Sequence, residues 1–570
     1  MSAGTAYRYD ASVLREVFER RFTYVAGIER NSHRFARSPA LHDPATGRRW
    51  TYAELWSDAG RLADALRSRG VAPGQSVVFS LFNGPEFALL WVACLRLGAI
   101  ATPINFRLSA GEVAHVLDDS LPGAFAFDAA LQRTAADALT RAEHQPALLV
   151  AVGEAAAPAA SFAELLATGD PAADVHPPAE TTIYEETTRL YTSGTTGLPK
   201  GVSLCSLTET LSAHDVIMHF PLEPHDRTLN MTPWFHRGGL YSGGPNPVFY
   251  VGAEAVSLRQ FEPATVLDWV QEHGLTFLIG APTNLAMLTA EQQRSPRDLS
   301  SLKGIVTMGA PLDREACLRY QRTLTARIFN GYGTTEAFWN TFLRPGDLPD
   351  HAGSAGRACT DDDVAVVRIY EDRLADPSDT VAQDGTEVGE VAVRSVKSGY
   401  AYVNNPTEQA ERFRDGWLYI GDLATWDEDE YVTIVGRKDD MIISGGENVH
   451  PTQVEAVLAE HPGVRDACVV GLPDERWGEI VVAYVVAEAP VATEPPVGQG
   501  GDRAPQAGHR ALAAALEAHC RNHPMLADFK RPRRYRFVDE LPMTATGKKL
   551  HYRVRALAQE DDAAGRLTQP

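Results

Sequence analysis

The chain has little cysteine and no excess of positive charge, and both shortages exclude classes of protein. Its 570 residues include only 6 cysteines, without a CxxC pair, so neither a disulfide framework nor a cysteine-based zinc site is expected. The 53 basic and 74 acidic side chains give a formal net charge of −21, which disfavours nucleic acid and anionic membrane surfaces as partners. A small anionic ligand stays compatible with this charge, because its site needs only a few local donors.

Long apolar segments are also missing. The N-terminal "MSAGTAYRYDASVLREVFERR" has no apolar core of a secretory signal. The most apolar run, "FALLWVACLRLGAIATPI", contains Arg96 and Gly98, and we interpret it as a buried helix leading into a strand. We therefore expect a cytoplasmic protein without a membrane span, and the sequence leaves a homodimer open.

The order of helical and extended segments predicts the domains. In the N-terminal part, "YAELWSDAGRLADALRSRG" has helical spacing up to Gly70 and is followed by the apolar strand "QSVVFSLF". This alternation predicts an α/β protein with a large N-terminal domain of parallel βα layers. Short strands between about 360 and 437 predict a β-rich subdomain, and a small α+β domain follows. We place the domains at 1–436 and 437–570, with the Ala-, Pro- and Gly-rich segment 487–510 as a flexible insertion.

The stretch "YTSGTTGLPKGV", residues 191–202, has the composition of a phosphate-binding loop. Glycines let backbone N–H groups approach phosphate oxygens, hydroxyls donate hydrogen bonds, and Lys200 adds charge. It is not a Walker A loop, because Lys200 is followed by Gly201 and not by a hydroxyl residue. A solvated turn is the ordinary alternative, but the composition favours polyphosphate binding.

Together with five later segments, this loop resembles the adenylate-forming superfamily of acyl-CoA synthetases, peptide-synthetase adenylation domains and beetle luciferases. The later segments occur in the order of the family's motifs and extend the resemblance over essentially the whole chain: "TPWFHRGGL" (232–240), "TMGAP" (307–311), "NGYGTTEA" (330–337), "YIGDLATWDEDEYVTIVGRKDDMIISGGENVHP" (419–451) and "LPMTATGKKLHY" (541–552).

The resemblance implies ATP as a substrate and assigns its site. The residues implied to hold the phosphates are Thr192, Ser193, Gly194, Thr195, Thr196 and Lys200, and those implied at the nucleotide are Gly331, Tyr332, Gly333, Thr334, Asp422 and Arg437. Tyr332 would stack on adenine, while Asp422 and Arg437 would meet the ribose; an ordinary Gly-Asp turn is the alternative for Asp422. Thr335 would lie at the α-phosphate and Glu336 would offer a carboxylate oxygen to Mg²⁺.

The resemblance also implies a catalytic lysine and a mobile C-terminal domain. Lys548 would bridge the substrate carboxylate and the α-phosphate in the transition state, although a basic, exposed tail is the alternative interpretation. Asp439 would be the hinge about which the C-terminal domain rotates between two half-reactions. Ser444, Gly445 and Gly446 would then face the pantetheine chain of coenzyme A.

The segment around His236 limits the class of carboxylic acid that the protein is expected to use. "WFHRGG" carries no acidic residue to hold an α-ammonium group, so we expect a carboxylic acid without an α-amino group. His236 would line or gate the acyl channel, or equally make a structural hydrogen bond. Acyl contacts are also predicted for Gly239, Gly309, Ala310 and Pro311. The glycines of "HRGGLYSGGPNPVFY" and Gly309 would leave room for a fatty, aryl or polycyclic acid, unless they serve the backbone. The predicted function is an acyl-CoA ligase; the alternatives are a single half-reaction, or loading of a carrier protein.

Overall fold

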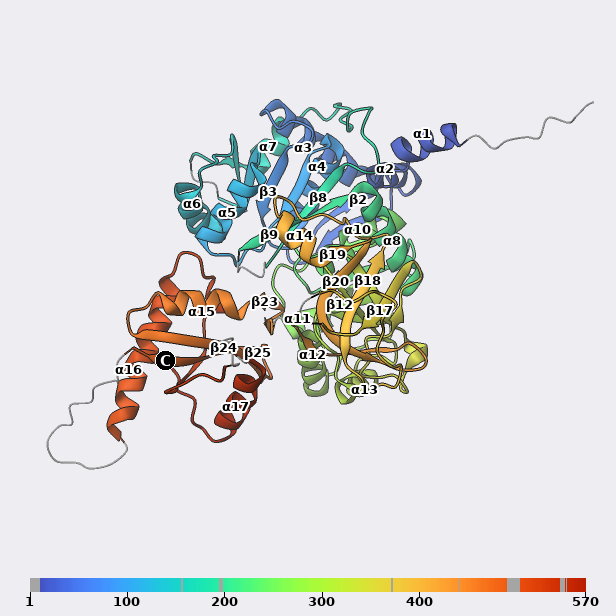
Figure 1. Cartoon of the computed structure of the whole chain (residues 1–570). Helices are drawn as coiled ribbons and strands as arrows, with labels where there is room; N and C mark the ends of the chain where they lie inside the picture. The colour runs from blue at the N-terminus through green and yellow to red at the C-terminus, as the bar shows by residue number, and fades with distance from the viewer. Residues whose placement is uncertain are drawn as a thin grey trace, which may run out of the picture.

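The structure is a computed structural model that describes residues 11–154, 157–193, 198–370, 373–438, 440–488, 503–543, 549 and 551–570. Over these residues the chain builds two mainly parallel sheets covered by helices, an antiparallel sheet, and a separate C-terminal α+β unit (Figure 1). The predicted fold class is therefore confirmed. After Ser12–Arg21 (α1), which buries no residue, Tyr24–Arg34 (α2) leads into the first layers.

The first parallel sheet occupies the N-terminal third and has the order β7-β6-β5-β3-β4-β8-β9. Its strands are Ser76–Ser80 (β3), Ile100–Pro103 (β4), Ala124–Asp128 (β5), Leu148–Val152 (β6), Ala160–Ser161 (β7), Glu186–Ser193 (β8) and Pro199–Cys205 (β9). The helices around it are Tyr52–Ser68 (α3), Pro85–Leu97 (α4), Ala110–Ser120 (α5), Gln132–Arg141 (α6) and Phe162–Thr168 (α7). All five residues of β3 are buried, as expected for a strand with helices on both faces. The predicted helix ending near Gly70 and the strand after it are both present.

The second sheet carries the later motifs and has the order β16-β15-β14-β13-β12-β10-β11-β1-β2. Its strands are Pro39–Asp43 (β1), Arg48–Thr51 (β2), Arg227–Asn230 (β10), Glu254–Val256 (β11), Phe277–Gly280 (β12), Gly304–Met308 (β13), Ile328–Thr334 (β14), Phe338–Leu343 (β15) and Arg357–Ala358 (β16). The strands from β14 to β1 run parallel. The connecting helices are Ser206–His219 (α8), Arg237–Tyr241 (α9), Pro245–Val251 (α10), Pro263–His273 (α11), Pro282–Arg294 (α12) and Arg314–Thr323 (α13).

An antiparallel sheet follows, in agreement with the predicted β-rich subdomain. It contains Asp362–Val367 (β17), Gly389–Ser395 (β18), Phe413–Arg414 (β19), Trp417–Trp426 (β20) and Val432–Arg437 (β21), with the short helix Pro406–Arg412 (α14) before β19. The last strand ends at Arg437, and the next sheet begins at Ile442.

The C-terminal unit surrounds a sheet of Ile442–Ser444 (β22), Glu447–Val449 (β23), Val464–Asp474 (β24), Gly478–Ala487 (β25) and Arg534–Phe537 (β26). Pro451–Ala459 (α15), Arg503–Asn522 (α16) and His551–Ala563 (α17) gather around it (Figure 1). The prediction of a flexible insertion over 487–510 is too long at its C-terminal end, because α16 begins at Arg503. The alanine-rich sequence favours a helix, and Ala513, Leu516 and Cys520 pack into the core of this unit. Residues 489–502 lie outside the described part of the chain.

The C-terminal unit contacts the N-terminal end of α5. The Lys530 ammonium lies 2.5 Å from Glu112 Oε1 and 2.9 Å from Gln453 Oε1, and the Gly111 amide donates to the Pro524 carbonyl. Lys530 and Glu112 are both buried, with side-chain exposures of 3% and 0%. In the described part of the chain, no helix is long and apolar enough to cross a membrane.

Candidate active site

The predicted acyl, adenine and metal segments meet at one edge of the second sheet. His236 follows β10, Gly309 follows β13, and Thr335 follows β14, all at the carboxyl ends of parallel strands. This edge is where ligands bind in open α/β sheets. A Cβ placed on Gly238 would lie 3.0 Å from Met308 Sδ, so the acyl segment contacts the end of β13.

The predicted nucleotide residues Tyr332, Asp422 and Arg437 form one hydrogen-bonded group. The Tyr332 hydroxyl donates to Asp422 Oδ2 at 2.7 Å, and Arg437 Nη1 lies 2.7 Å from Asp422 Oδ1. Burial, together with the Asp422 charge, raises the pKa of Tyr332 well above its usual value, so the phenol stays protonated. The structure thus joins β14 to β20 and β21 and presents an aromatic ring next to a buried carboxylate. Their adenine and ribose contacts stay predictions.

The phosphate segment forms the antiparallel hairpin of β8 and β9. Thr192 pairs with Lys200 across the two strands, so both lie at the end that leads into the loop. Ser193 ends β8, whereas Gly194, Thr195 and Thr196 lie outside the described residues. The Lys200 ammonium lies 2.7 Å from Glu408 Oε1 on α14 and 4.3 Å from the centre of the Tyr402 ring. Glu408 was not predicted, because nothing in "NNPTEQAERF" distinguishes it from the exposed face of a short helix.

Glu336 lies in a tight turn, Thr335 to Ala337, between β14 and β15. Its Oε1 accepts a 2.6 Å hydrogen bond from the Tyr402 hydroxyl. The carboxylate and the neighbouring Thr335 hydroxyl are hard oxygen donors, and Mg²⁺ in nucleotide sites uses one or two protein carboxylates together with phosphate oxygens. The donor set present therefore fits the predicted magnesium. Tyr402 also touches Lys200, so a single ring connects the phosphate hairpin with the predicted metal ligand.

The C-terminal domain inserts the β22–β23 hairpin next to His236. Gly445 and Gly446 form its two-residue turn with φ of 61° and 79°, values that a type I′ turn requires and that favour glycine. These glycines therefore have a backbone reason, besides the predicted room for a pantetheine chain. Ser444 and Glu447 pair across the turn. Asp439, the predicted hinge, lies outside the described residues.

Glu447 makes the contact between this hairpin and the N-terminal domain. Its carboxylate lies 3.3 Å from His236 Nε2, accepts a 2.7 Å hydrogen bond from Asn105, and lies 3.3 Å from Arg107 Nη1. The Glu447 side chain is only 5% exposed. The sequence pattern included Glu447 in "SGGEN" but assigned it no role; only the tertiary structure places it on His236.

The structure favours a backbone role for Gly239, which is the alternative to space for the acyl group. A Cβ on Gly239 would lie 1.8 Å from the Pro233 carbonyl oxygen, and one on Gly244 would lie 1.9 Å from the Gly239 carbonyl oxygen. Both glycines are needed because two pieces of backbone approach closely. Gly309 differs, since a Cβ there would have no neighbour within 4 Å, although its φ of 81° disfavours other residues. Ala310 and Pro311 follow it on the partly exposed edge.

The predicted catalytic Lys548 lies outside the described residues. Its neighbour Lys549, to which no role was assigned, is held by the C-terminal domain itself. The Lys549 ammonium lies 2.8 Å from Asp466 and 3.5 Å from Glu455. Lys549 is thus a structural anchor next to the predicted catalytic position.

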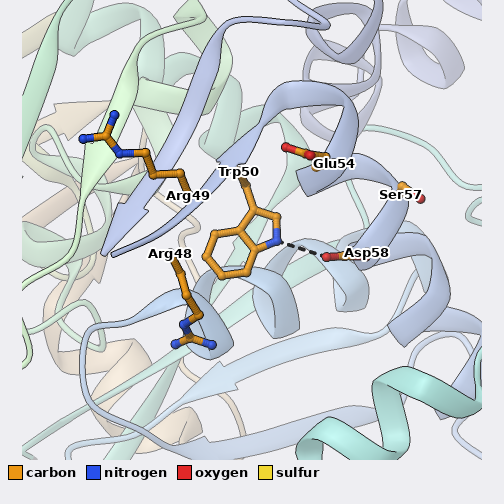
Figure 2. A pocket seen from close by; sticks show the side chains of 6 residues that line it. All are labelled: Arg48, Arg49, Trp50, Glu54, Ser57 and Asp58. Carbon is orange, nitrogen blue, oxygen red and sulfur yellow. Dashed lines mark hydrogen bonds between the residues drawn. The ribbon is translucent and has the colours of Figure 1, made fainter. Parts of the chain in front are cut away.

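A surface pocket elsewhere contains none of the predicted residues. It is lined by Arg48, Arg49, Trp50, Glu54, Ser57 and Asp58, from β2 and α3 (Figure 2). The Trp50 indole N–H donates to Asp58 at 3.0 Å, which satisfies its polar atom within the protein. β2 is the edge strand at the opposite end of the sheet order from β14 and β15, so this pocket is separate from the candidate active site.

Comparison with known proteins identifies the class. Residues 28–401 match the family described as "AMP-binding enzyme", and residues 453–548 match "AMP-binding enzyme C-terminal domain". The chain belongs to the AMP-binding enzyme family and is an adenylate-forming, acyl-activating ligase that uses ATP.

Two sequence relatives and one solved structure show which proteins the chain is similar to. The chain is 34% identical over 507 residues to a feruloyl-CoA synthase of Amycolatopsis sp, with 89% of this chain and 93% of the relative covered. It is 32% identical over 532 residues to a fatty acid–[acyl-carrier-protein] ligase, ScoC, of Streptomyces coeruleorubidus, covering 90% and 94%. Among solved structures it is similar to the amide bond synthetase McbA from Marinactinospora thermotolerans, with a TM-score of 0.77, 27% identity, and coverage of 94% and 99%.

Proposed function

We propose that the protein is an acyl-CoA ligase that activates an apolar carboxylic acid without an α-amino group, of the aryl or fatty class. The observation that carries this proposal is the contact of Glu447 with His236, which brings the "SGGEN" hairpin of the C-terminal domain onto the acyl segment. A thiol that enters along this hairpin would reach the acyl segment at His236.

The first half-reaction is adenylation. A carboxylate oxygen attacks the α-phosphorus of ATP, the bond to the β-phosphate oxygen breaks, and acyl-AMP and pyrophosphate form. Thr192 and Lys200 would hold the departing phosphates, and Glu336 would hold Mg²⁺, which when bound neutralises phosphate charge. Lys548 would stabilise the charge that develops at the α-phosphate. This step depends mainly on positioning and charge stabilisation.

The second half-reaction is thioester formation. The thiol loses its proton, its sulfur attacks the acyl carbonyl carbon, and AMP leaves with the bonding electron pair. Asp439 would be the hinge that brings the C-terminal domain into place, and Ser444, Gly445 and Gly446 would border the thiol's path. His236 and Glu447 together would form the wall between the acyl group and this path, since they are 3.3 Å apart.

The substrate class rests on two observations. No acidic side chain occurs in "WFHRGG" to bind an α-ammonium group, and the relatives named above include a feruloyl-CoA synthase and a ligase for fatty acids. The glycine-rich segment no longer supports a large pocket, because Gly239 and Gly244 pack against backbone.

Two alternatives differ in the acceptor of the acyl group. The relatives include a ligase that uses an acyl-carrier protein and an amide bond synthetase. A carrier protein would present the same thiol chemistry, whereas an amine acceptor would give an amide from the same acyl-AMP.

The test separates the two half-reactions. The purified protein is incubated with ATP, Mg²⁺ and a panel of aryl, fatty and amino acids, and pyrophosphate release is measured with and without coenzyme A. We expect release with aryl or fatty acids and thioester only when coenzyme A is present. Release without thioester, but with product after addition of a carrier protein or an amine, would replace the CoA assignment by the corresponding alternative.

A further inference from the structure

Arg237 is a buried cation that is directed at backbone carbonyls. It is the first residue of α9, directly after His236, and only 2% exposed. Burial lowers its pKa. Among the described residues, no carboxylate lies within salt-bridge distance of Arg237. Its guanidinium donates hydrogen bonds to other groups. The Glu209 and Glu336 carboxylates attract this charge from beyond salt-bridge distance, so the groups that satisfy the buried guanidinium directly are those that accept its hydrogen bonds.

Two of those groups belong to the turn that carries Glu336. Arg237 Nη1 donates to the Thr335 carbonyl at 2.6 Å and to the Glu336 carbonyl at 3.3 Å. Nη2 donates to Ser212 Oγ on α8 at 3.0 Å and to the Lys397 carbonyl at 2.8 Å. The guanidinium therefore ties the turn to two other elements.

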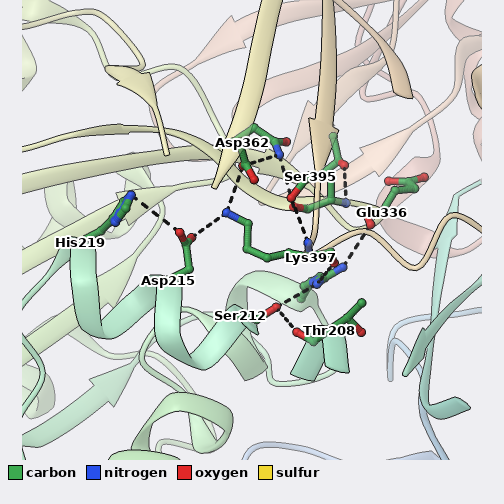
Figure 3. Close-up of polar contacts among 12 residues, drawn as sticks. Thr208, Ser212, Asp215, His219, Glu336, Asp362, Ser395 and Lys397 are labelled. Atoms are coloured by element: carbon green, nitrogen blue, oxygen red, sulfur yellow. Dashed lines mark hydrogen bonds and ion pairs between the residues drawn. The ribbon is translucent and has the colours of Figure 1, made fainter. Parts of the chain in front are cut away.

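The other two groups are themselves held in place. The Lys397 ammonium lies 3.1 Å from Asp215 and 3.0 Å from Asp362, and all three side chains are at most 2% exposed (Figure 3). The Ser212 hydroxyl donates to the Thr208 carbonyl at 2.7 Å, within α8. Arg237 is thus held through Nη2 by Ser212 and the Lys397 carbonyl, while Nη1 donates to the turn.

The turn needs such support because its backbone is strained. Phe338, directly after it, has a φ of 62°, in the left-handed region where loops of this length usually have glycine. On the neighbouring strand β14, Gly333 leaves room for the Phe338 backbone, since a Cβ added to Gly333 would lie 1.5 Å from the Phe338 carbonyl oxygen. The Arg237 guanidinium also lies 5.5 Å from the centre of the Phe338 ring.

We propose that Arg237 is a positioning residue, which holds the Thr335–Glu336 backbone so that the Glu336 carboxylate is presented to the magnesium of bound ATP. This inference rests on the proposed function for the role of Glu336, but the hydrogen bonds to the turn do not. Groups that orient a metal ligand typically change metal affinity by about 10- to 100-fold when they are replaced.

Arg96 provides a matched control. It is also a buried arginine, 3% exposed, and it also donates to backbone carbonyls, those of Trp56 at 2.6 Å and Val175 at 3.2 Å. Its guanidinium lies 3.9 Å from the centre of the Trp56 ring. Arg96 lies in α4, which packs on the first sheet. Replacing Arg96 should therefore affect stability without affecting the turn at Thr335–Ala337.

The first measurement is hydrogen–deuterium exchange of the ligand-free protein. In Arg237→Met, amides of residues 334–340 should exchange faster than in the wild type, because the turn opens more easily without the hydrogen bonds of the guanidinium. Arg96→Met should leave these amides unchanged. Arg237→Lys, which keeps the buried charge, should fall between them and serves as the test if Arg237→Met does not fold. Wild-type exchange at the turn in the folded Arg237 variants would overturn the proposal.

The second measurement is the affinity for Mn²⁺ with ATP, determined by electron paramagnetic resonance, together with the Mg²⁺ concentration for half-maximal pyrophosphate release. The dissociation constant of Mn²⁺ and the half-maximal Mg²⁺ concentration should both rise about tenfold or more in the Arg237 variants and stay at the wild-type level in Arg96→Met. An equal rise in Arg96→Met would show a general loss of stability and overturn the proposal. If the wild type released no pyrophosphate with any acid, the proposed function would fail, while the exchange measurement would still decide whether Arg237 holds the turn.

Discussion

Gly238 and Gly239 are neighbours in α9, but an added methyl group would have a different effect at each. On Gly239 the Cβ would lie 1.8 Å from the Pro233 carbonyl oxygen and 2.9 Å from the Trp234 nitrogen. On Gly238 it would lie 3.0 Å from Met308 Sδ and 3.1 Å from Met308 Cε, at the end of a flexible side chain. Gly239→Ala must therefore move backbone, whereas Gly238→Ala only requires Met308 to change its conformation.

The expected magnitudes follow from this contrast. Overpacking a core costs about 1–3 kcal/mol, or more where backbone must shift, and the gain from restricting the unfolded chain is only about 0.4–1 kcal/mol. We expect Gly239→Ala to lower the free energy of unfolding by about 2 kcal/mol or more. Gly238→Ala should change it by less than about 1 kcal/mol, because Met308 can adapt.

The assay combines stability and selectivity. Denaturant unfolding, followed by the fluorescence of the 9 tryptophans, gives the change in stability, and kcat/KM is measured with butyrate and with a bulky aryl acid. For Gly239→Ala we expect both acids to lose activity by a similar factor. For Gly238→Ala we expect a wild-type unfolding midpoint and a change confined to the bulky acid. A Gly239→Ala variant of normal stability that is selectively poor with the bulky acid would refute the backbone explanation and restore Gly239 to the acyl pocket.

Three further predictions concern the two half-reactions. Lys548→Ala should lose pyrophosphate release by several orders of magnitude and still convert a supplied acyl-adenylate to the thioester, so an equal loss in both assays would contradict its role. Glu336→Gln should raise the Mg²⁺ concentration for half-maximal adenylation, because a neutral amide is a weaker ligand; an unchanged metal dependence at normal rate would make Glu336 structural. Lys530→Met should leave the Glu112 carboxylate buried without its cation, which costs about 3–5 kcal/mol in this domain arrangement. Because this arrangement places the "SGGEN" hairpin, the proposed border of the thiol's path, at His236, the variant should slow thioester formation from supplied acyl-adenylate more than pyrophosphate release, with partial recovery in the Glu112→Gln/Lys530→Met double variant. An equal loss relative to the wild type in both assays would mean that this ion pair does not set the domain arrangement.

Much of the fold could be predicted because its signals are local. The helix that starts at Tyr52 has the capping pair Thr51 and Glu54, which satisfies its first amides. The helix before Gly98 ends there because glycine readily adopts the φ of 75° found at this position. The predicted insertion 487–510 overlaps α16 from Arg503, where a Pro- and Gly-rich segment passes into an alanine-rich helix, because composition alone does not locate such a boundary.

The sequence by itself determined which chemical groups are available: a hydroxyl- and glycine-rich loop with Lys200, the acid Glu336, and the pair Asp422 and Arg437. Residue type and order along the chain were enough for this, because each motif is a short continuous stretch. The resemblance implied that Asp422 and Arg437 lie together at the nucleotide, whereas the 2.7 Å contacts of Asp422 with Tyr332 and with Arg437 are a property of the folded sheets.

Only the tertiary structure decided what surrounds those groups. Lys200 meets Glu408 from 208 positions away, and Arg237 reaches the Thr335 carbonyl across 98 positions. Gly239 has a neighbour only 6 positions away, but the 1.8 Å approach to Pro233 depends on the path of the backbone and not on residue type. Burial, ion pairing and close packing arise when distant segments are brought together, so no local pattern could assign them.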